Sequence, residues 1–354
     1  MYTMIKIAIV GGGPAGSYCA YCLAEDRLSP VIFDHTHPRE KPCGGLVTPM
    51  AQKLFPFLER LPIKHGERNE LRLISPSGRQ VCLSTRRTMI RTFSRLELDQ
   101  YLVNMAVKEG AELIREKVVA LERKNDFWKI KTTRGLYHVK ILIGADGVNS
   151  LVRRTIVGPL SKMDKGICCG YLAKGLEKED ITIKLLAHRK GFIWIIPRDD
   201  QTSLGIGTSE VSRSYTLRQE LNVFIQEKHP RVRIISKWTA LIPNVKSVKT
   251  FRVPLAGPNW MLIGDAAGHV NPISGEGIVY ALLDGELAAQ AVVEKKPEMF
   301  NELWRKAYGS HLLVDIKLRK RLYTRSGLEL YCKFLKFQNA LYLYRQPLTM
   351  LSLS

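Results

Sequence analysis

The chain has 354 residues, of which 45% are hydrophobic and 25% charged, a globular composition that argues against intrinsic disorder. Lysine and arginine together number 54 against 33 aspartate and glutamate residues, which gives a formal net charge of +21. This charge favours an anionic partner, either an acidic membrane surface or a phosphorylated substrate, unless the protein is simply basic throughout. No nucleic acid is expected as a partner, because the sequence contains neither a zinc-ligand spacing nor an RNA-binding signature.

Cysteine usage and hydropathy favour a cytoplasmic protein. The seven cysteines are an odd number at irregular positions, which does not resemble a disulfide framework and suits a reducing compartment. No stretch reaches the roughly 18 uninterrupted apolar residues that a membrane-spanning helix needs. The first residues lack the basic region, apolar region and cleavage site of a signal peptide.

The N-terminal residues predict a compact βαβ unit. Residues 5–10 are an apolar, β-branched run interrupted only by Lys6, which is typical of a parallel strand buried on both faces. Residues 17–24 are mostly small and predict a helix, and residues 30–33 predict a second buried strand that ends at Asp34.

The loop between the first strand and the helix carries the glycines of a dinucleotide fingerprint. We expect Gly11 to permit a tight turn, Gly13 to let the backbone approach a pyrophosphate, and Gly16 to allow close helix–strand packing. The helix N-terminus would supply N–H groups and a favourable dipole to the phosphates. Asp34, which follows Gly16 by 18 residues, would accept hydrogen bonds from ribose hydroxyls. These features predict a dinucleotide without identifying it.

The remaining elements come in three groups. Strands are expected at residues 71–74 and 81–83, around a turn at 75–78, and a helix at 95–110. A hairpin-like segment at 118–121, 128–131 and 137–143 follows, and residues 166–257 are expected to alternate short strands and turns. Another buried strand at 260–263, a long helix from about residue 278 into the 290s, and a helical, basic and aromatic stretch at 298–354 complete the chain.

Two further motifs indicate a family. Gly144-Ala-Asp146-Gly follows a buried strand, and Gly264-Asp265-Ala-Ala-Gly268 precedes the long helix. Together with the glycine loop and the segment from Arg95 to Asp99, they resemble the large family of single-component FAD enzymes that includes aromatic hydroxylases, flavin halogenases and geranylgeranyl reductases. The resemblance implies that FAD is the dinucleotide.

The resemblance also assigns positions along the cofactor. It implies that Asp265, Gly277 and Ile278 touch the ribityl chain and isoalloxazine, and that Arg95 lies at the pyrophosphate. Asp146 would lie near the pyrophosphate in a mostly structural role, and the backbone of Val119 would contact adenine. The full implied cofactor-binding set is Gly11, Gly13, Pro14, Ala15, Gly16, Asp34, Cys43, Gly44, Gly45, Arg95, Val119, Asp146, Asp265, Pro272, Gly275, Gly277 and Ile278.

Two shorter segments resemble the geranylgeranyl reductases in particular. Lys41-Pro-Cys43-Gly44-Gly45-Leu is similar to the segment by which those enzymes pass the reactive edge of the flavin. Residues 191–197 resemble the strand that lines their isoprenoid pocket, which implies Phe192, Trp194 and Pro197 as substrate-binding residues. Reducing an alkene needs a hydride and a proton, and Cys43 is the implied catalytic proton donor. Two other roles for Cys43 remain open, namely flavin contact alone and an inert buried thiol.

The expected fold is α/β. It combines a Rossmann-type FAD-binding domain with a mostly parallel sheet, an inserted antiparallel-sheet substrate domain, and a helical C-terminal region. The expected ranges are 1–60, 92–160 and 256–298 for the FAD-binding domain, 61–91 and 161–255 for the substrate domain, and 299–354 for the C-terminal region.

The leading functional hypothesis is an FAD-dependent reductase of isoprenoid double bonds that acts on a prenyl lipid or a prenyl diphosphate. One alternative is an oxygen-using flavin monooxygenase or halogenase, because residues 192–197 come within one residue of the halogenases' tryptophan-x-tryptophan-x-isoleucine-proline strand. Another is a lipid-binding flavoprotein without catalysis. Gly205-Ile-Gly207 lacks a third glycine, so no separate NAD(P)H domain is expected, and NAD(P)H, ferredoxin or a quinol would be the external reductant.

The C-terminal stretch suggests where the protein works. Its aromatic residues are interleaved with basic ones, a composition that suits either a helix in an anionic membrane interface or a helix that caps the substrate domain. A peripheral position on the inner face of a membrane is therefore expected beside a cytoplasmic one. The basic residues are Lys317, Arg319, Lys320, Arg321, Arg325, Lys333, Lys336 and Arg345.

Two sets of potentially reactive residues are expected to be structural. Cys19 and Cys22 lie inside the first helix and are expected to be small packing residues rather than a redox couple. His35 and His37 have no third ligand in view, so no metal site is expected.

Overall fold

The structure is a computed structural model that describes residues 4–84 and 89–344. The chain packs into two compact units, each assembled from three separate stretches of sequence. The first unit comprises residues 1–40, 96–165 and 242–316, and the second comprises residues 41–95, 166–241 and 317–354.

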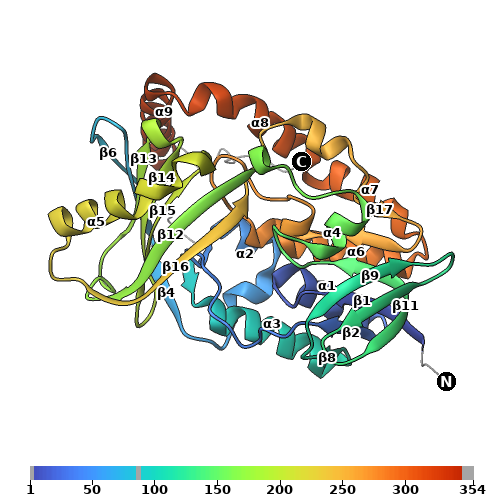
Figure 1. Cartoon of the computed structure of the whole chain (residues 1–354). Coiled ribbons are helices and arrows are strands. Elements are labelled where there is room, and N and C mark those ends of the chain that lie inside the picture. Colours follow the sequence, from blue (N-terminus) through green and yellow to red (C-terminus); the bar gives the residue numbers. More distant parts are fainter. Residues whose placement is uncertain (1–3, 85–88, 345–354) are drawn as a thin grey trace. The chain divides into compact units, whose positions relative to one another are not determined.

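An eight-stranded sheet forms the centre of the first unit (Figure 1). Five of its strands run parallel in the order β18-β11-β1-β2-β8, as a Rossmann-type core requires. β17 pairs antiparallel with β18 at one edge, and β10 and β9 extend from β11 as an antiparallel meander. The strands are β1 (Met4–Val10), β2 (Pro30–Phe33), β8 (Glu112–Ile114), β9 (Val118–Arg123), β10 (Trp128–Thr132), β11 (Leu136–Gly144), β17 (Ala256–Gly257) and β18 (Trp260–Leu262).

The helices of the first unit cover this sheet. α1 (Pro14–Glu25) and α6 (Ile278–Val293) pack against each other beside the sheet (Figure 1). They approach closely because a Cβ on Gly285 of α6 would stand only 2.9 Å from the backbone of Ala15 and Cys19 in α1. The other helices with residues in this unit are α3 (Arg95–Glu109), α4 (Leu151–Ile156), α7 (Phe300–Trp304), a π-helical turn (Arg305–Gly309) and α8 (Ser310–Leu322).

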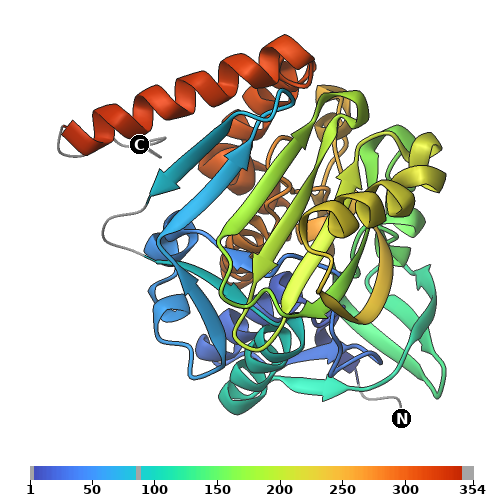
Figure 2. The same ribbon diagram turned by 90° about the vertical axis from the view of Figure 1, so that its left-hand side faces the viewer.

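The second unit contains a seven-stranded sheet (Figure 2) in the order β16-β12-β15-β14-β13-β5-β6. Its pairing is antiparallel from β12 through β15 and β14 to β13 and between β5 and β6, but β13 and β5 run parallel. The expectation of an antiparallel sheet is therefore confirmed with one parallel pair added. The strands are β5 (Glu70–Ile74), β6 (Gln80–Ser84), β12 (Lys165–Lys174), β13 (Ile181–Leu186), β14 (Gly191–Pro197), β15 (Thr202–Thr208) and β16 (Arg233–Pro243).

A small three-stranded sheet completes the β structure of the second unit. It has the order β3-β7-β4, with antiparallel pairing throughout. Its strands are β3 (Leu46–Val47), β4 (His65–Arg68) and β7 (Ile90–Phe93), and α2 (Pro49–Leu54) follows β3.

The stretch expected to hold only strands and turns, residues 166–257, also contains a helix. α5 (Leu217–Lys228) lies across one face of the seven-stranded sheet (Figure 2) and forms a separate core with it. The helical spacing of the apolar residues was the signal that the sequence analysis missed. The buried residues of α5 are Leu217, Leu221, Phe224 and Ile225.

The compact units differ from the expected domain ranges at several boundaries, and two of the larger differences are explained by packing. Residues 41–60, expected in the FAD-binding domain, belong to the second unit because β3 pairs with β7 there. Residues 299–316, expected in the C-terminal region, belong to the first unit because Trp304 and Tyr308 are fully part of its core. Both differences arise from packing partners that are distant in sequence.

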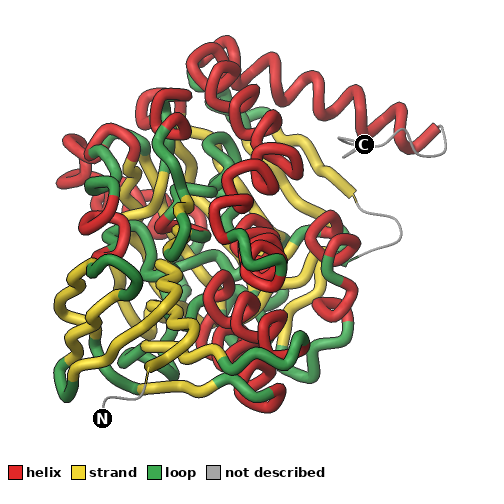
Figure 3. The backbone as a smooth tube through the Cα atoms, turned by 90° about the vertical axis from the view of Figure 1, so that its right-hand side faces the viewer, coloured by secondary structure: helices red, strands yellow, loops and turns green. Residues whose placement is uncertain are grey.

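The C-terminal residues are helical, as expected, for as far as the structure describes them. α9 (Arg325–Tyr344) is a single long helix on the outside of the second unit, and it packs against β6 (Figures 2 and 3). Arg345 and the residues after it lie outside the described part of the chain. Within the described ranges, no helix is both long and apolar enough to cross a bilayer.

Candidate cofactor and substrate site

Three loops meet at the carboxyl ends of neighbouring parallel strands in the first unit. Val10 at the end of β1 pairs with Gly144 at the end of β11, and Gly144 in turn pairs with Leu262 at the end of β18. The glycine loop, the Gly144–Gly147 loop and the Gly264–Gly268 loop therefore start side by side. Ligands of open parallel sheets bind at such an edge, beyond the carboxyl ends of the strands.

The glycine loop has the geometry that its sequence predicts. Gly11 has a φ of +104°, and a Cβ there would overlap the carbonyl oxygen of Ala145, so only glycine fits. A Cβ on Gly16 would overlap the carbonyl oxygen of Gly11, which confirms its role in close packing. Pro14 occupies the first turn of α1, where its missing N–H has no cost.

The helices of the first unit differ in how their N-termini are capped. α1 begins after Gly13 and α6 begins after Gly277, and neither helix has a side-chain cap. α4, by contrast, is capped by Ser150, whose Oγ accepts a hydrogen bond from the Arg153 N–H at 2.8 Å. The first N–H groups of α1 and α6 thus remain available to an external acceptor. Each of these two helix ends therefore suits a polar group of a dinucleotide.

Asp34 holds the glycine loop in place. Its Oδ2 accepts a hydrogen bond from the Gly12 N–H at 2.8 Å, and its Oδ1 accepts from the Thr36 N–H at 2.8 Å. Burial alone raises the pKa of such a carboxyl, but the hydrogen bonds from Thr36 and Gly12 outweigh it and lower the pKa of Asp34 below its ordinary value. The carboxylate therefore has a structural task that the sequence analysis did not foresee, and its contact with ribose stays a prediction.

Asp146 and Arg153 tie the middle loop to its neighbours. Asp146 accepts hydrogen bonds from the Ser150 hydroxyl and from the Leu151 N–H at 2.6 Å, so it supports the start of α4, consistent with the structural role expected of it. Burial raises the pKa of Asp146 above the ordinary carboxyl value. The buried Arg153 donates to the carbonyl oxygen of Ala266 at 3.1 Å, which joins α4 to the late Gly264–Gly268 loop.

The late motif places Asp265 beside the start of α6. A Cβ on Gly277 would lie 3.8 Å from Oδ1 of Asp265, so the carboxylate and the uncapped helix end face the same space. Asn271 shapes the loop between them, because its Oδ1 accepts hydrogen bonds from the N–H groups of Ile273 and Ser274 at 2.9 Å.

A buried polar network supports this motif from behind. Asp284 is fully buried and accepts hydrogen bonds from the Gly264 N–H at 2.7 Å and from the His269 ring at 2.8 Å. The Tyr308 hydroxyl also donates to Asp284, and burial raises the pKa of this phenol well above its ordinary value. Sequence analysis missed Asp284 and Tyr308, because neither lies in a motif and Tyr308 reaches the network from a π-helical turn.

Arg39 is another candidate that the sequence analysis missed. Its Nη1 donates to Oδ2 of the buried Asp99 at 2.8 Å. Its Nη2 lies 3.8 Å from where a Cβ on Gly13 would stand. A guanidinium therefore stands beside the loop that is expected to approach the pyrophosphate, although a single arginine after the second strand is a weak signal in sequence.

Two other implied cofactor residues have less distinctive surroundings. Arg95 is the first residue of α3 and is only 3% exposed. Val119 lies at an irregularity in the pairing of β9 with β10, between Val118 and Ala120, and is 43% exposed. Their contacts with FAD stay predictions.

The second unit brings the Cys43 segment against its largest sheet. The carbonyl oxygen of Cys43 accepts hydrogen bonds from Nη2 of Arg198 at 2.9 Å and from Oγ of Ser203 at 3.0 Å. The Gly45 N–H donates to Sγ of Cys43 at 3.3 Å, which orients the sulfur. A Cβ on Gly44 would overlap the side chain of Ile196, so the segment lies flat on β14.

The implied substrate residues lie next to this segment. Nε1 of the buried Trp194 donates to Oγ of Ser203 at 3.1 Å, so one hydroxyl links the tryptophan to the Cys43 carbonyl. The ring centroids of Phe192 and Trp194 are 5.9 Å apart. The carbonyl oxygen of Pro197 accepts a hydrogen bond from the Thr92 hydroxyl at 2.6 Å. Sequence analysis missed Ser203, although it connects two of the residues that it had selected.

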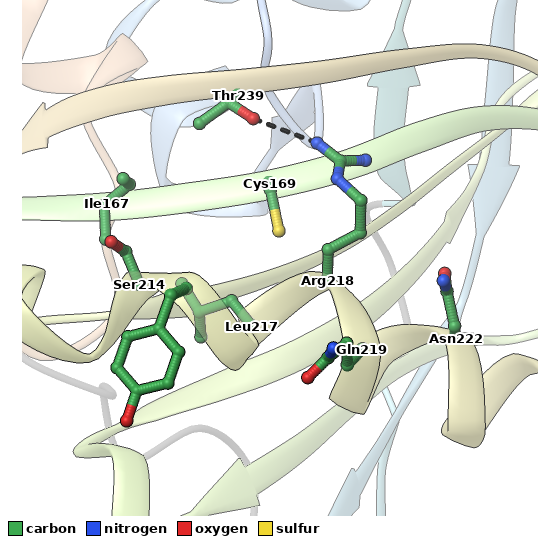
Figure 4. A pocket seen from close by; sticks show the side chains of 9 residues that line it. Ile167, Cys169, Ser214, Leu217, Arg218, Gln219, Asn222 and Thr239 are labelled. Carbon is green, nitrogen blue, oxygen red and sulfur yellow. Dashed lines mark hydrogen bonds between the residues drawn. The ribbon is translucent and has the colours of Figure 1, made fainter.

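A cavity of about 430 Å³ lies elsewhere in the second unit, between α5 and the edge of the seven-stranded sheet (Figure 4). None of the implied site residues lines it. Its lining consists of Ile167, Cys169, Ser214, Tyr215, Leu217, Arg218, Gln219, Asn222 and Thr239.

The implied residues thus form two groups, one in each unit. The first unit carries Gly11, Gly13, Pro14, Ala15, Gly16, Asp34, Val119, Asp146, Asp265, Pro272, Gly275, Gly277 and Ile278, and the second carries Cys43, Gly44, Gly45, Arg95, Phe192, Trp194 and Pro197.

Cys19 and Cys22 pack in the core of the first unit, as expected of them. Cys19 is fully buried in α1, and burial raises the pKa of Cys22 to about 12, so neither is a reactive thiol. All seven cysteines are free. Across residues 4–84 and 89–344, no three or more histidine, cysteine or acidic side chains cluster as metal ligands would.

Comparison with known proteins finds relatives over most of the chain. Residues 9–47 match the family model of the NAD(P)-binding Rossmann-like domain. The chain is 30% identical to geranylgeranyl diphosphate reductase of Rhodobacter capsulatus, over 80% of this chain and 74% of that one. It is 24% identical to digeranylgeranylglycerophospholipid reductase of Methanocaldococcus jannaschii, over 92% and 88%. A geranylgeranyl bacteriochlorophyll reductase-like structure from Thermoplasma acidophilum shares the fold with a TM-score of 0.83 and 21% identity, over 100% and 94%.

Asp34→Asn should lower the free energy of unfolding by about 1–2 kcal/mol near neutral pH, because the amide replaces a charged acceptor of buried hydrogen bonds. The lowered pKa makes this contribution present above the ordinary carboxyl pKa of about 3.9 and lost as the pH falls through the folded value. Urea unfolding across this range should therefore show the two proteins converging in acid. Asp180→Asn, at a carboxylate that is 41% exposed, is the control. A gap that widens as the pH falls would contradict the assignment.

Proposed function

The chain belongs to the geranylgeranyl reductase family of FAD-dependent oxidoreductases, and from this premise we propose that it reduces carbon–carbon double bonds of an isoprenoid substrate. The observation that carries the proposal is the hydrogen-bonded link from Cys43 through Ser203 to Trp194 in the second unit. It holds the backbone of Cys43, whose thiol can donate a proton, next to an aromatic surface that can contact an alkene.

The substrate class is supported by three independent features. The relatives in Rhodobacter and Methanocaldococcus are named for geranylgeranyl diphosphate and for a digeranylgeranyl glycerophospholipid. Both substrates are anionic prenyl compounds, and the net charge of +21 favours such ligands. Phe192 and Trp194 supply apolar surface for the prenyl chain. We therefore propose a prenyl diphosphate or a prenyl phospholipid.

Reduced FAD, when bound, supplies the hydride that is added to one alkene carbon and is itself oxidised. We propose that the Cys43 thiol gives its proton to the other carbon, after which solvent restores the thiol. Positive charge that develops on the alkene faces the π surface of Trp194, a contact worth about 1–2 kcal/mol in a dry site. Ser203 and Arg198 are positioning residues, because they hold the Cys43 carbonyl rather than the substrate.

The other cofactor residues bind and orient. The N–H groups at the start of α1 suit the pyrophosphate, with Arg39 as a nearby positive charge. Asp265 suits the ribityl hydroxyls, since its carboxylate faces the start of α6. The external reductant is proposed to be NAD(P)H, ferredoxin or a quinol.

The alternatives receive less support. An oxygen-using halogenase is not favoured, because Phe192 stands where the halogenase strand has its first tryptophan and the relatives compared above are named as reductases. A lipid-binding flavoprotein without catalysis would leave the link between Cys43 and Trp194 without a chemical purpose.

We also propose that the protein, in the cytoplasm, works at the inner face of an anionic membrane, with α9 as the contact. The helix buries Leu328, Cys332 and Leu335 against its own unit. On the opposite side, at the same spacing, Leu330, Phe334 and Phe337 are 68%, 52% and 62% exposed. The second stripe is an apolar surface that the described residues of the unit, 41–84, 89–95, 166–241 and 317–344, leave exposed.

Basic residues accompany the exposed stripe of α9. Lys333 and Lys336 are exposed on the same helix, and Lys317, Lys320 and Arg321 are exposed near the end of α8. Each basic residue near an anionic surface contributes about 1 kcal/mol, and the apolar side chains add the energy of burial among lipid. Arg319 does not contribute, because it is buried over the Tyr323 ring.

Anaerobic reduction of the flavin followed by addition of a geranylgeranyl compound tests the proposed reaction. Flavin reoxidation should occur without oxygen, and mass spectrometry should find products heavier by one pair of hydrogens for each double bond reduced. Geranylgeranyl diphosphate and a digeranylgeranyl glycerophospholipid are the two probes. Product formation that requires oxygen would favour the monooxygenase alternative, and tight binding without reoxidation would favour the non-catalytic one.

Cys43→Ala should retain FAD and its spectrum but lose roughly 10²-fold or more in the rate of alkene reduction, because it lacks the proton donor. Cys82→Ala, at an exposed cysteine of the same unit, is the matched control. Stopped-flow reoxidation of pre-reduced enzyme measures the step directly. Full activity of Cys43→Ala would remove the proposed role.

The double variant Phe334→Ser, Phe337→Ser should bind vesicles of phosphatidylglycerol at least about fivefold less tightly in co-sedimentation, because the apolar stripe is lost. Tyr215→Ser changes a side chain that is 81% exposed elsewhere in the same unit and should bind as the original protein does. Lys333→Gln, Lys336→Gln should make binding less sensitive to salt. Equal binding by the Phe334 double variant and the control would overturn the α9 assignment.

A further inference from the structure

Three glycines form a flat area on one face of the seven-stranded sheet. Gly205 in β15 pairs with Trp194 in β14 on one side and with Gly170 in β12 on the other. Directly paired residues share a face of the sheet, and Gly207, two residues after Gly205, shares it too. This is the face opposite the one that α5 covers, because Cys169, next to Gly170, belongs to the α5 core.

Two tryptophan rings lie on this glycine area. A Cβ on Gly205 would overlap the Trp194 indole, and a Cβ on Gly170 would stand 2.5 Å from the Trp238 indole. The two rings are nearly parallel, with an interplanar angle of 24° and centroids 5.8 Å apart. Glycine in the middle of a strand weakens a sheet, so its presence at these positions is explained by the room it makes for the rings.

Arg218 of α5 fixes the position of Trp238 by hydrogen bonds to the edge strand β16. Its Nη2 donates to the carbonyl oxygen of Trp238 at 2.8 Å. It also donates to the hydroxyl of Thr239 at 2.9 Å, the bond drawn in Figure 4. Its Nη1 reaches the carbonyl oxygen of Gly170 at 3.4 Å. The guanidinium therefore connects β12 and β16. It does so at Gly170, against which the Trp238 ring lies, and at Trp238 itself.

We propose that Trp238 is a specificity-determining residue that extends the aromatic surface of Phe192 and Trp194 and selects for long isoprenoid chains. This inference rests on the proposed function, because it presupposes an isoprenoid substrate. Trp194 lies nearest to Cys43 through Ser203, whereas Trp238 lies one ring further along the sheet. A short prenyl chain that reaches Trp194 gains little from Trp238, but a longer chain covers both rings.

Binding and turnover of a long and a short prenyl diphosphate test this inference. Trp238→Ala should weaken the binding of geranylgeranyl diphosphate about tenfold by calorimetry, and geranyl diphosphate less than about threefold, because only the longer chain loses apolar contact. The ratio of kcat/KM for the two substrates should fall in the same proportion. Trp238→Phe should restore most of the preference, since it keeps an aromatic ring.

Tyr215→Ala is the matched control, an exposed aromatic residue of the same unit on the α5 side, and it should change neither ratio. Near-ultraviolet circular dichroism should show the paired-indole signal lost in Trp238→Ala but retained in Tyr215→Ala. This separates loss of the ring pair from unfolding. Arg218→Gln should reduce the chain-length preference partially, because it removes the bonds that hold Trp238.

The outcomes separate this inference from the proposed function. Turnover of both substrates with an unchanged long-to-short ratio in Trp238→Ala would overturn the role of Trp238 and leave the reductase proposal intact. Binding that depends on Trp238 without any flavin reoxidation would support the role and overturn the reductase proposal. Failure of the original protein to bind either a prenyl diphosphate or a prenyl phospholipid would overturn both.

Discussion

The close contact between Gly11 and the carbonyl oxygen of Ala145 is the constraint on which the first unit depends. No side chain fits there, so β1 and β11 can end side by side and their loops can share one edge. Asp34 and Arg153 then fasten the neighbouring loops, one through the Gly12 N–H and the other through the Ala266 carbonyl. α1 and α6 begin without side-chain caps, and these are the helix ends at which we propose that the cofactor binds.

The glycines of the second unit serve a different purpose. Gly44 lets the Cys43 segment lie against β14, and Gly170 and Gly205 let two indoles lie against the sheet. In both units glycine marks the place where something must approach a backbone closely. In the first unit it is a neighbouring loop and, as we propose, a phosphate. In the second it is an aromatic ring, which we propose that an isoprenoid chain covers.

Buried polar groups fix these surfaces without contacting the reacting atoms. Asp284 joins the late FAD motif to His269 and Tyr308, and Ser203 joins Trp194 to the Cys43 carbonyl. An unsatisfied buried donor or acceptor costs about 1–3 kcal/mol, so each network favours one arrangement over its alternatives. A reductase that must keep hydride chemistry away from water has reason to hold its site this firmly.

The sequence by itself determined the local elements and the cofactor. The second strand, Pro30–Phe33, the turn at Gly11 and the family motifs were all readable because each depends on residues a few positions apart. Tertiary structure alone decided the contacts between residues that are far apart in the sequence. Ser203 contacts Cys43, which lies 160 residues earlier in the chain. Tyr308 donates to Asp284 from a helix that carries no motif. Trp238 lies against Gly170 because β16 is the neighbour of β12 in the sheet. Pairing and packing place such partners together, and no local spacing records them.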